Sequence, residues 1–251
     1  MNLDWLTARP IAHRGRHDHA RGVIENSFAA ADIAVASNCA IECDVQMSAD
    51  GEAFVFHDEG LGRLTNARGF IRKTSSANLA SVKLAGSGGD ESIPPLGAFL
   101  DRIGRRVPLI IEIKSLFDGH MRLAERTAQI ATAYAGHVAI KSFDPFLIAH
   151  LRRSELCENI PLGIVAQTRF DHAEWAFLND GQKQAMTHLL HWRETRPDFI
   201  SYSVRDLPHA AMTLARAALH MPVMTWTVRT PAQWDTAQRQ ADQAIFEGPL
   251  P

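Results

Sequence analysis

Short apolar runs, rich in β-branched residues, alternate with longer helix-like segments along the whole chain. This alternation predicts βα units and a parallel sheet, because parallel neighbours need a crossover connection between them. Strands are predicted near residues 10–13, 40–45, 109–113, 138–142, 161–165, 199–202, 223–226 and 243–246. Eight such units are typical of a closed barrel, so we expect an α/β chain of that architecture.

Helices are predicted between these strands, near residues 26–37, 95–104, 120–134, 145–156, 182–193, 207–219 and 231–240. Two of them have well-defined starts. Asp144-Pro145 and Thr230-Pro231 each place an N-cap residue before a proline at the first helical position, where the missing N–H costs nothing. Residues 53–56 are expected to extend the second strand or to pair with it as a hairpin.

The stretch from about 59 to 94 interrupts the alternation, with a Gly-Ser-Gly-Gly run at 86–89 and two prolines at its end. We interpret it as a small insertion after the second strand, lying over the C-terminal mouth of the barrel, where active sites of this architecture lie. The sequence contains no linker long enough to separate two domains. We therefore expect residues 1–251 to form a single domain.

Charged residues recur where the apolar runs end. In the segment Ile41-Glu42-Cys43-Asp44-Val45, alternation along a strand places the two acids on one face and the apolar residues on the other. The same pattern separates Glu112 and Lys114 from their apolar neighbours. Because unpaired charge is costly to bury, this pattern predicts a charged interior that binds something and an apolar exterior.

Glu42, Asp44 and Glu112 would come from neighbouring strands and converge near the mouth. Two unit charges about 4 Å apart repel by roughly 4 kcal/mol at an effective dielectric of 20, so three carboxylates need a cation. Ligation by oxygen alone favours Mg²⁺ or Ca²⁺. The alternative is that Arg14, Lys114 and other cations neutralise the acids in a structural network of salt bridges.

Further polar residues at strand ends suit chemistry on a phosphate. His13 and His57 could supply a general acid and a general base near neutral pH, although an average histidine among the chain's 12 is a surface or core residue. Arg14 and Lys114 suit an anionic ligand, unless they merely balance the acids. Trp226 could offer an apolar wall to a small alcohol or belong to the core.

Other chemistries find less support. No histidine spacing typical of zinc sites is present, and no nucleophile elbow marks a serine or cysteine for covalent catalysis. Lys and Arg number 26 against 28 Asp and Glu, a formal charge of −2, so no general attraction to nucleic acid is implied.

Cysteine use and the chain's N-terminus bear on location. Cys39, Cys43 and Cys157 are too few and too irregular for a disulfide framework, so reduced thiols are expected. The N-terminus lacks the pattern of a signal peptide, and no apolar run approaches the ~20 residues that cross a bilayer. We expect a cytoplasmic protein without stable membrane insertion, and the sequence leaves the oligomeric state open.

An ordered set of segments resembles the glycerophosphodiester phosphodiesterase family over nearly the whole chain, from residue 11 to about 248. These segments are His13-Arg14-Gly15, Glu25-Asn26-Ser27, Glu42-Cys43-Asp44-Val45, His57-Asp58, Glu112-Ile113-Lys114, Ser142-Phe143 and Trp226-Thr227-Val228. The resemblance implies a TIM-type (β/α)8 barrel, one divalent cation (Mg²⁺ or Ca²⁺), and hydrolysis of a glycerophosphodiester to glycerol 3-phosphate and an alcohol.

Roles follow from the same resemblance, position by position. Glu42, Asp44 and Glu112 match the metal ligands, and His13 and His57 match the acid–base pair. Arg14 and Lys114 match phosphate contacts. Glu25 matches an acid near the metal.

The chain departs from the family pattern at two places. Ile24 and Ser27 replace the proline and threonine of the Pro-Glu-Asn-Thr motif, and Phe246-Glu247-Gly248-Pro249 replaces a Thr-Asp-Xaa-Pro segment. Neither change removes a predicted catalytic group, and both bear on the shape of the mouth. Two further functions remain open: a phospholipase D-like hydrolase of lysophospholipids, which would need an apolar groove built from residues 59–94, and a non-catalytic phosphate-binding barrel.

Overall fold

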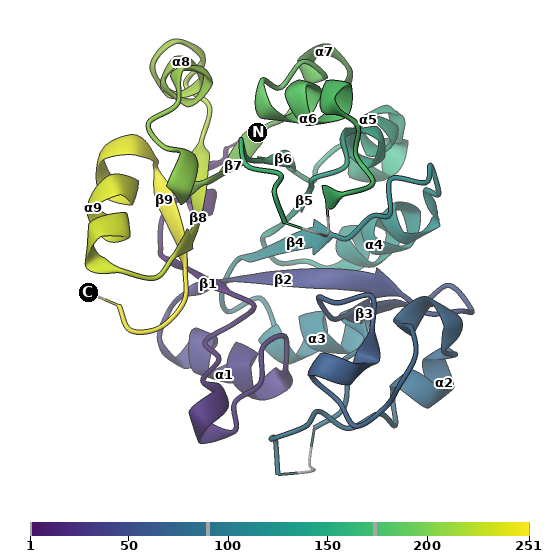
Figure 1. Cartoon of the computed structure of the whole chain (residues 1–251). Coiled ribbons are helices and arrows are strands. Elements are labelled where there is room, and N and C mark those ends of the chain that lie inside the picture. The colour runs from purple at the N-terminus through teal and green to yellow at the C-terminus, as the bar shows by residue number, and fades with distance from the viewer. Residues whose placement is uncertain (1, 89–90, 173–174, 251) are drawn as a thin grey trace.

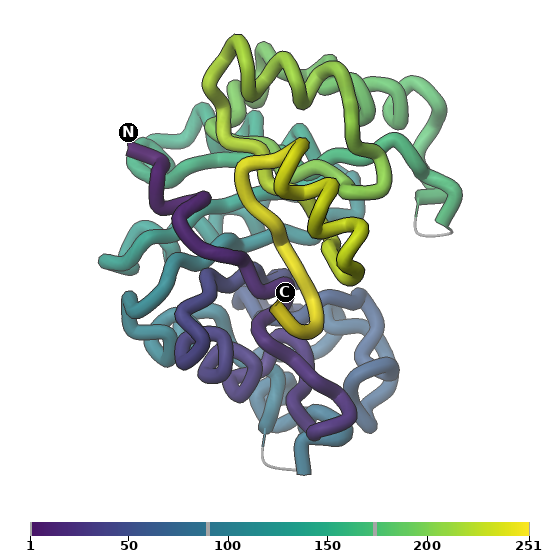
Figure 2. The backbone as a smooth tube through the Cα atoms, turned by 90° about the vertical axis from the view of Figure 1, so that its left-hand side faces the viewer, coloured from purple at the N-terminus to yellow at the C-terminus, as the bar shows by residue number. Residues whose placement is uncertain are grey.

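Parallel strand pairing closes the chain into a barrel in the computed structural model, which describes residues 2–88, 91–172 and 175–250. Within these residues, eight parallel strands follow one another around the barrel: β1 (Ile11–His13), β2 (Ala40–Met47), β4 (Leu109–Ile113), β5 (Val138–Ser142), β6 (Leu162–Ala166), β7 (Phe199–Ser203), β8 (Val223–Val228) and β9 (Gln243–Phe246). The pairing of β1 with both β2 and β9 closes the sheet. Figure 2 shows the yellow C-terminal segment beside the purple N-terminal one. The predicted TIM-type fold is confirmed.

The inward-facing side chains form two layers of opposite character. The lower layer is apolar and closes the N-terminal end of the barrel with Ile11, Ala40, Ile110, Ala139, Phe199, Met224 and Ile245. Two residues further along the same strands, where alternation returns the side chain to the same face, the layer is mostly polar: His13, Glu42, Glu112, Lys141, Ser201, Trp226 and Glu247. The charged interior predicted from the sequence therefore lies at the C-terminal end of the barrel.

Helices pack around the barrel, as Figure 1 shows. In the described residues they are α1 (Phe28–Ala36), α2 (Ser76–Leu79), α3 (Leu96–Ile103), α4 (Arg122–Ala133), α5 (Pro145–Arg153), α6 (Asp180–Thr187), α7 (Trp192–Thr195), α8 (Ala210–Leu219) and α9 (Pro231–Gln240). Their apolar faces cover the outward-facing strand residues, among them Ile41, Cys43 and Ile111, and make the main hydrophobic core. The apolar exterior of the sheet is the surface that the helices bury.

Both helix starts marked by proline are confirmed. The Asp144 side chain accepts a hydrogen bond from the backbone N–H of Phe146 at the start of α5, and Thr230 accepts one from Gln233 at the start of α9. The helix predicted over 182–193 was wrong as a single element. It divides into α6 and α7, because Leu189 adopts a left-handed conformation with φ of 56°.

The segment after β2 forms a small unit with its own core. β3 (Ala53–Val55) pairs antiparallel with β2, as a hairpin partner, and is followed by two 3₁₀ turns and α2. Apolar residues of this segment turn inward and pack against Ile24, Phe54 and Phe56: Leu61, Leu64, Ile71, Leu79, Leu84 and Ile93. The insertion is therefore held together by its own apolar contacts beside β2.

The three cysteines are free and buried, as expected for reduced thiols. Within the described parts of the chain, the helices are too short or too polar to span a bilayer.

Gly163 leaves space in the barrel interior for the side chain of Phe199. A Cβ at this position would overlap the Phe199 ring, which is fully buried in the lower layer and would have to shift. We predict that Gly163→Ala lowers the free energy of unfolding by roughly 1–3 kcal/mol in urea titrations.

Gly97→Ala is the matched control. Gly97 lies in α3, and an added Cβ would meet nothing within 4 Å. This variant should be unchanged or more stable by up to about 1 kcal/mol, because alanine is the better helix former. Equal effects of the two substitutions would contradict the packing argument.

Candidate active site

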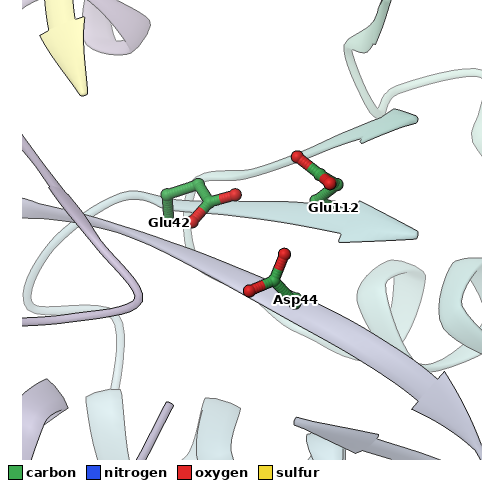
Figure 3. A group of neighbouring side chains, drawn as sticks. All are labelled: Glu42, Asp44 and Glu112. Carbon is green, nitrogen blue, oxygen red and sulfur yellow. The ribbon is translucent and has the colours of Figure 1, made fainter. Parts of the chain in front are cut away.

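Three carboxylates converge inside the barrel at its polar, C-terminal end. Glu42 and Asp44 lie on β2, and Asp44 is in register with Glu112 of β4. All three are buried, with exposed fractions of 0–5%. Each offers a ligand oxygen, and these oxygens lie within 4.8 Å of one another. Figure 3 shows the side chains pointing toward a common space between the two strands. We refer to Glu42, Asp44 and Glu112 as the acidic triad.

Three cationic side chains contact the acidic triad. Lys114 Nζ lies 2.9 Å from Asp44 Oδ1 and 2.6 Å from Glu112 Oε1. Arg14 Nε lies 3.0 Å from Asp44 Oδ2. The network of ion pairs considered from the sequence is therefore present, and it occupies the same space as the predicted cation site.

Lys141 is the third cation, and the sequence reasoning missed it. Its Nζ lies 3.0 Å from Glu42 Oε1 and 3.1 Å from Glu112 Oε2, and the residue is 1% exposed. The signal was available in the sequence. Lys141 interrupts the apolar run of β5 at the position two residues after Ala139, where alternation points it inward.

The ion pairs keep both kinds of group charged. Burial alone would raise the pKa of Asp44 and Glu112, but the positive charge of Lys114, with Arg14 or Lys141, outweighs it. The pKa of Glu112 falls to about 2, and that of Asp44 falls well below its usual range. Burial alone would lower the pKa of Lys114, and the two carboxylates raise it instead. Asp44 and Glu112 are thus ionised at neutral pH.

The donor set suits a hard divalent cation. Carboxylate oxygens are the ligands that Mg²⁺ and Ca²⁺ prefer. Glu42 Oε1 is buried inside the barrel, where the Lys141 ammonium at 3.0 Å is its ion-pair partner. The neighbouring Glu42 Oε2 accepts a hydrogen bond from the backbone N–H of Arg14 at 3.3 Å.

Both predicted histidines lie at the site, and each is held by a carboxylate. His13 Nδ1 lies 2.5 Å from Glu247 Oε1, and its Nε2 lies 3.9 Å from Glu42 Oε2. His57 Nδ1 lies 2.7 Å from Asp58 Oδ1. In both histidines the carboxylate contacts Nδ1, so Nε2 is the ring nitrogen that can exchange a proton with a substrate.

Glu25 is one ion pair removed from the acidic triad. Its Oε1 accepts from Arg14 Nη1 at 2.6 Å, and Arg63 of the insertion donates to both of its oxygens at 2.8 and 2.9 Å. Arg63 also pairs with Asp58 and so joins Glu25 to the partner of His57. The sequence reasoning missed Arg63, because its contacts depend on how the insertion folds back.

The loop after β1 and the start of α1 bring these groups together. Arg14 and Asn26 have left-handed backbones, with φ of 56° and 59°. Gly15 follows with φ of 78°, where a Cβ would lie 2.8 Å from the Ala30 backbone, so glycine allows α1 to approach. The Asn26 side chain donates to Asp44 Oδ2 at 3.0 Å and accepts from the Asp44 N–H at 3.3 Å. Asn26 thereby fixes the orientation of Asp44.

Aromatic rings line the opposite side of the mouth. Trp226 lies in the polar layer, on β8, and donates from Nε1 to the carbonyl of Ser201 at 3.0 Å. Its ring meets Phe143 edge to face at 5.4 Å between centroids, and Phe143 contacts Trp175 at 4.9 Å. Phe143 directly follows β5, two residues after Lys141, so its ring lies at the C-terminal end of the barrel.

Comparison with known proteins identifies the family. The model of the glycerophosphoryl diester phosphodiesterase family matches residues 13–246. The chain belongs to this family. The match begins at His13 and ends with the last barrel strand, so it spans the site described above apart from Glu247.

Two curated glycerophosphodiester phosphodiesterases show the similarity in sequence. A putative one, YhdW of Bacillus subtilis, is 30% identical over 167 residues, covering 64% of this chain and 66% of the relative. One from Caldanaerobacter subterraneus is 30% identical over 165 residues, covering 62% and 66%. The chain thus spans slightly less than two thirds of the length of these family members.

Solved structures show the shared fold. A phosphodiesterase from Oleispira antarctica, in complex with the product sn-glycerol-3-phosphate, has a TM-score of 0.77 and 20% identity over 95% of this chain and 92% of its own. A putative glycerophosphoryl diester phosphodiesterase from Silicibacter pomeroyi has a TM-score of 0.75 and 21% identity, with coverages of 95% and 89%. At this identity, the likeness establishes the barrel of the family.

Glu25 is expected to make folding pH dependent. Burial would raise its pKa, but the hydrogen bonds from Arg63 and the charge of Arg14 lower it to about 2, against 4.5 for an ordinary glutamate. A lowered pKa stabilises the fold above the unfolded value, and this contribution is lost as the pH falls toward the folded value. From about pH 6 to about pH 3.5, the loss should be roughly 1.4 kcal/mol.

The measurement is urea unfolding of the chain and of Glu25→Gln, in EDTA, over this pH range. The variant should be less stable at neutral pH, and the difference should shrink by that amount on acidification. Glu158→Gln, which alters an exposed carboxylate after α5, should keep a constant difference. A Glu25→Gln difference that does not depend on pH would contradict the assignment.

Proposed function

We propose that this chain is a metal-dependent phosphodiesterase that hydrolyses glycerophosphodiesters to glycerol 3-phosphate and an alcohol. The single observation that carries the proposal is a buried acidic triad with an imidazole on either side and cations within contact, all at the C-terminal end of one barrel. Family membership and the glycerol phosphate bound to the Oleispira relative give further support.

The metal would be held by Glu42, Asp44 and Glu112. A divalent cation, either Mg²⁺ or Ca²⁺, would supply Lewis-acid stabilisation of charge on the phosphate oxygens. Glu25 lies beyond this first set of ligands, and its role is to hold Arg14 against Asp44.

Charge balance explains how an anionic substrate is drawn in. Arg14, Lys114 and Lys141 neutralise the three negative charges of the acidic triad, each through a contact of 3.1 Å or less. A bound divalent ion leaves the site with surplus positive charge, which a phosphodiester can offset. Lys114 and Arg14, both partly exposed toward the mouth, then turn to the non-bridging phosphate oxygens.

His13 and His57 carry the proton transfers. One imidazole takes a proton from the nucleophile, which is water or the glycerol hydroxyl next to the phosphate, and the other donates a proton to the departing alkoxide. The carboxylates of Glu247 and Asp58 orient the two rings. Trp226 and Phe143 offer the carbons of the glycerol moiety an apolar wall.

The phospholipase D-like function is less well supported. It predicted an apolar groove from residues 59–94. Most large apolar residues of that stretch are instead buried in their own small core, and Phe70 is the large one that is exposed. The non-catalytic alternative predicted the loss of a metal ligand or a histidine, and all five of these residues are present. The single-domain organisation and the cytoplasmic location stay predictions.

Hydrolysis assays across glycerophosphodiesters test the substrate and the metal together. We expect release of glycerol 3-phosphate from glycerophosphocholine, loss of activity in EDTA, and recovery when Mg²⁺, Ca²⁺ or Mn²⁺ is added. A lysophospholipid serves as the comparison substrate and should react more slowly. Activity that survives thorough chelation would exclude the role given to the acidic triad.

Alanine variants of the histidines test the acid–base assignment. Because a general acid or base contributes about 10²–10⁴-fold, His13→Ala and His57→Ala should each lower kcat by roughly that range. Binding of Mn²⁺, followed by its paramagnetic signal, should persist in both variants. His150→Ala is the control, since His150 pairs with Glu125 between α4 and α5. Unchanged turnover in both site variants would remove the assignment.

A further inference from the structure

The register of the first and last strands brings Glu247 to His13. Ile11 of β1 pairs with Ile245 of β9, and His13 and Glu247 each follow two residues later on the same inner face. The backbone N–H of Glu247 donates to the Val228 carbonyl at 3.0 Å, so the chain stays paired beyond β9. Side chains opposite each other on neighbouring strands are about 5 Å apart at Cβ, which allows direct contact.

The Glu247 carboxylate is fixed from two sides. Its Oε1 lies 2.5 Å from His13 Nδ1 and accepts from Arg229 Nη2 at 2.9 Å. Its Oε2 accepts from Arg229 Nε at 2.7 Å. This two-point contact with the planar guanidinium sets the plane of the carboxylate. His17 Nε2 also faces Oε1, but at 4.0 Å, so His13 is the nearer imidazole.

The protonation state follows from these contacts. Burial would raise the pKa of Glu247, but the hydrogen bonds with His13 and Arg229 outweigh it and hold the pKa well below its usual range. An ionised carboxylate can only accept hydrogen bonds, so Nδ1 of His13 must be the donor. The second ring nitrogen, Nε2, faces the acidic triad, 3.9 Å from Glu42 Oε2.

We propose that Glu247 is a positioning residue that holds His13 in the Nδ1–H tautomer, so that Nε2 is the nitrogen that exchanges a proton in the reaction. The carboxylate also stabilises the imidazolium that forms when Nε2 takes up a proton, as the aspartate of a Ser-His-Asp triad does for its histidine. This inference rests on the proposed function for its kinetic consequence. The tautomer itself is a property of the protein without substrate.

The tautomer is tested by ¹⁵N NMR of the histidine side chains, with His13→Ala used to assign the resonances of His13. The full chain should show a protonated Nδ1 and an unprotonated Nε2 when His13 is neutral. Glu247→Gln should shift His13 toward a mixture of tautomers, because an amide can donate as well as accept. A neutral His13 protonated at Nε2 in the full chain would overturn the proposal, whatever the activity.

Kinetics test the consequence with glycerophosphocholine and added Mg²⁺. Glu247→Gln should lower kcat by roughly 10- to 100-fold, part of the effect of removing the imidazole, and change KM by less than about threefold. In the His13→Ala background, the same substitution should change kcat by less than about twofold. If the fold-decrease in kcat of the double variant equals the product of the two single decreases, the proposal is overturned, because Glu247 would then act independently of His13.

Asp242→Asn is the matched control. Asp242 directly precedes β9, at the end of the strand far from Glu247. It pairs with Arg216 at 2.9 Å and accepts a hydrogen bond from the Val223 N–H at 2.8 Å. It should lose stability in urea without altering kcat or the His13 resonances. Absence of hydrolysis by the wild-type chain would count against the proposed function, and the NMR result would still decide the role of Glu247.

Discussion

The structure depends on the electrostatic cost of placing three carboxylates inside a barrel. The apolar lower layer excludes water from beneath Glu42, Asp44 and Glu112, so their charges must be stabilised by other side chains. Three basic residues provide this stabilisation: Arg14 from the loop after β1, Lys114 just beyond β4, and Lys141 within β5. Strand pairing therefore sets which charges meet.

Much of this arrangement follows from local sequence patterns. Alternation along a strand determines which residues face inward, so the positions of Glu42, Asp44 and Glu112 could be predicted from β2 and β4 alone. Helix starts at Asp144 and Thr230 were also predictable, because capping is a contact between residues a few positions apart.

Two kinds of feature could not be predicted from the sequence. One is a contact between residues far apart in the chain, and the other is a turn whose sequence contains no glycine or proline. Arg63 reaches Glu25 only when the insertion folds back, and Glu247 reaches His13 only when β9 pairs with β1 to close the barrel. The break between α6 and α7 at Leu189 carries no glycine or proline to mark it, so local propensity favoured one continuous helix. Lys141 differs, because its inward position was readable from β5 once the strand was placed.

With the proposed metal ion bound, the same basic residues would serve a second state of the site. In the structure described here, Lys114 bridges Asp44 and Glu112, the positions at which a divalent ion would be ligated. If the acidic triad held a divalent ion with these oxygens, Lys114 would lose both carboxylate partners, and a phosphate oxygen of the substrate could replace them. Lys141 is buried at 1% exposure between Glu42 and Glu112. The two lysines would therefore act differently. Lys114 could exchange a carboxylate partner for a substrate oxygen, whereas Lys141 would reduce the repulsion among the carboxylates of the acidic triad with or without a bound ion.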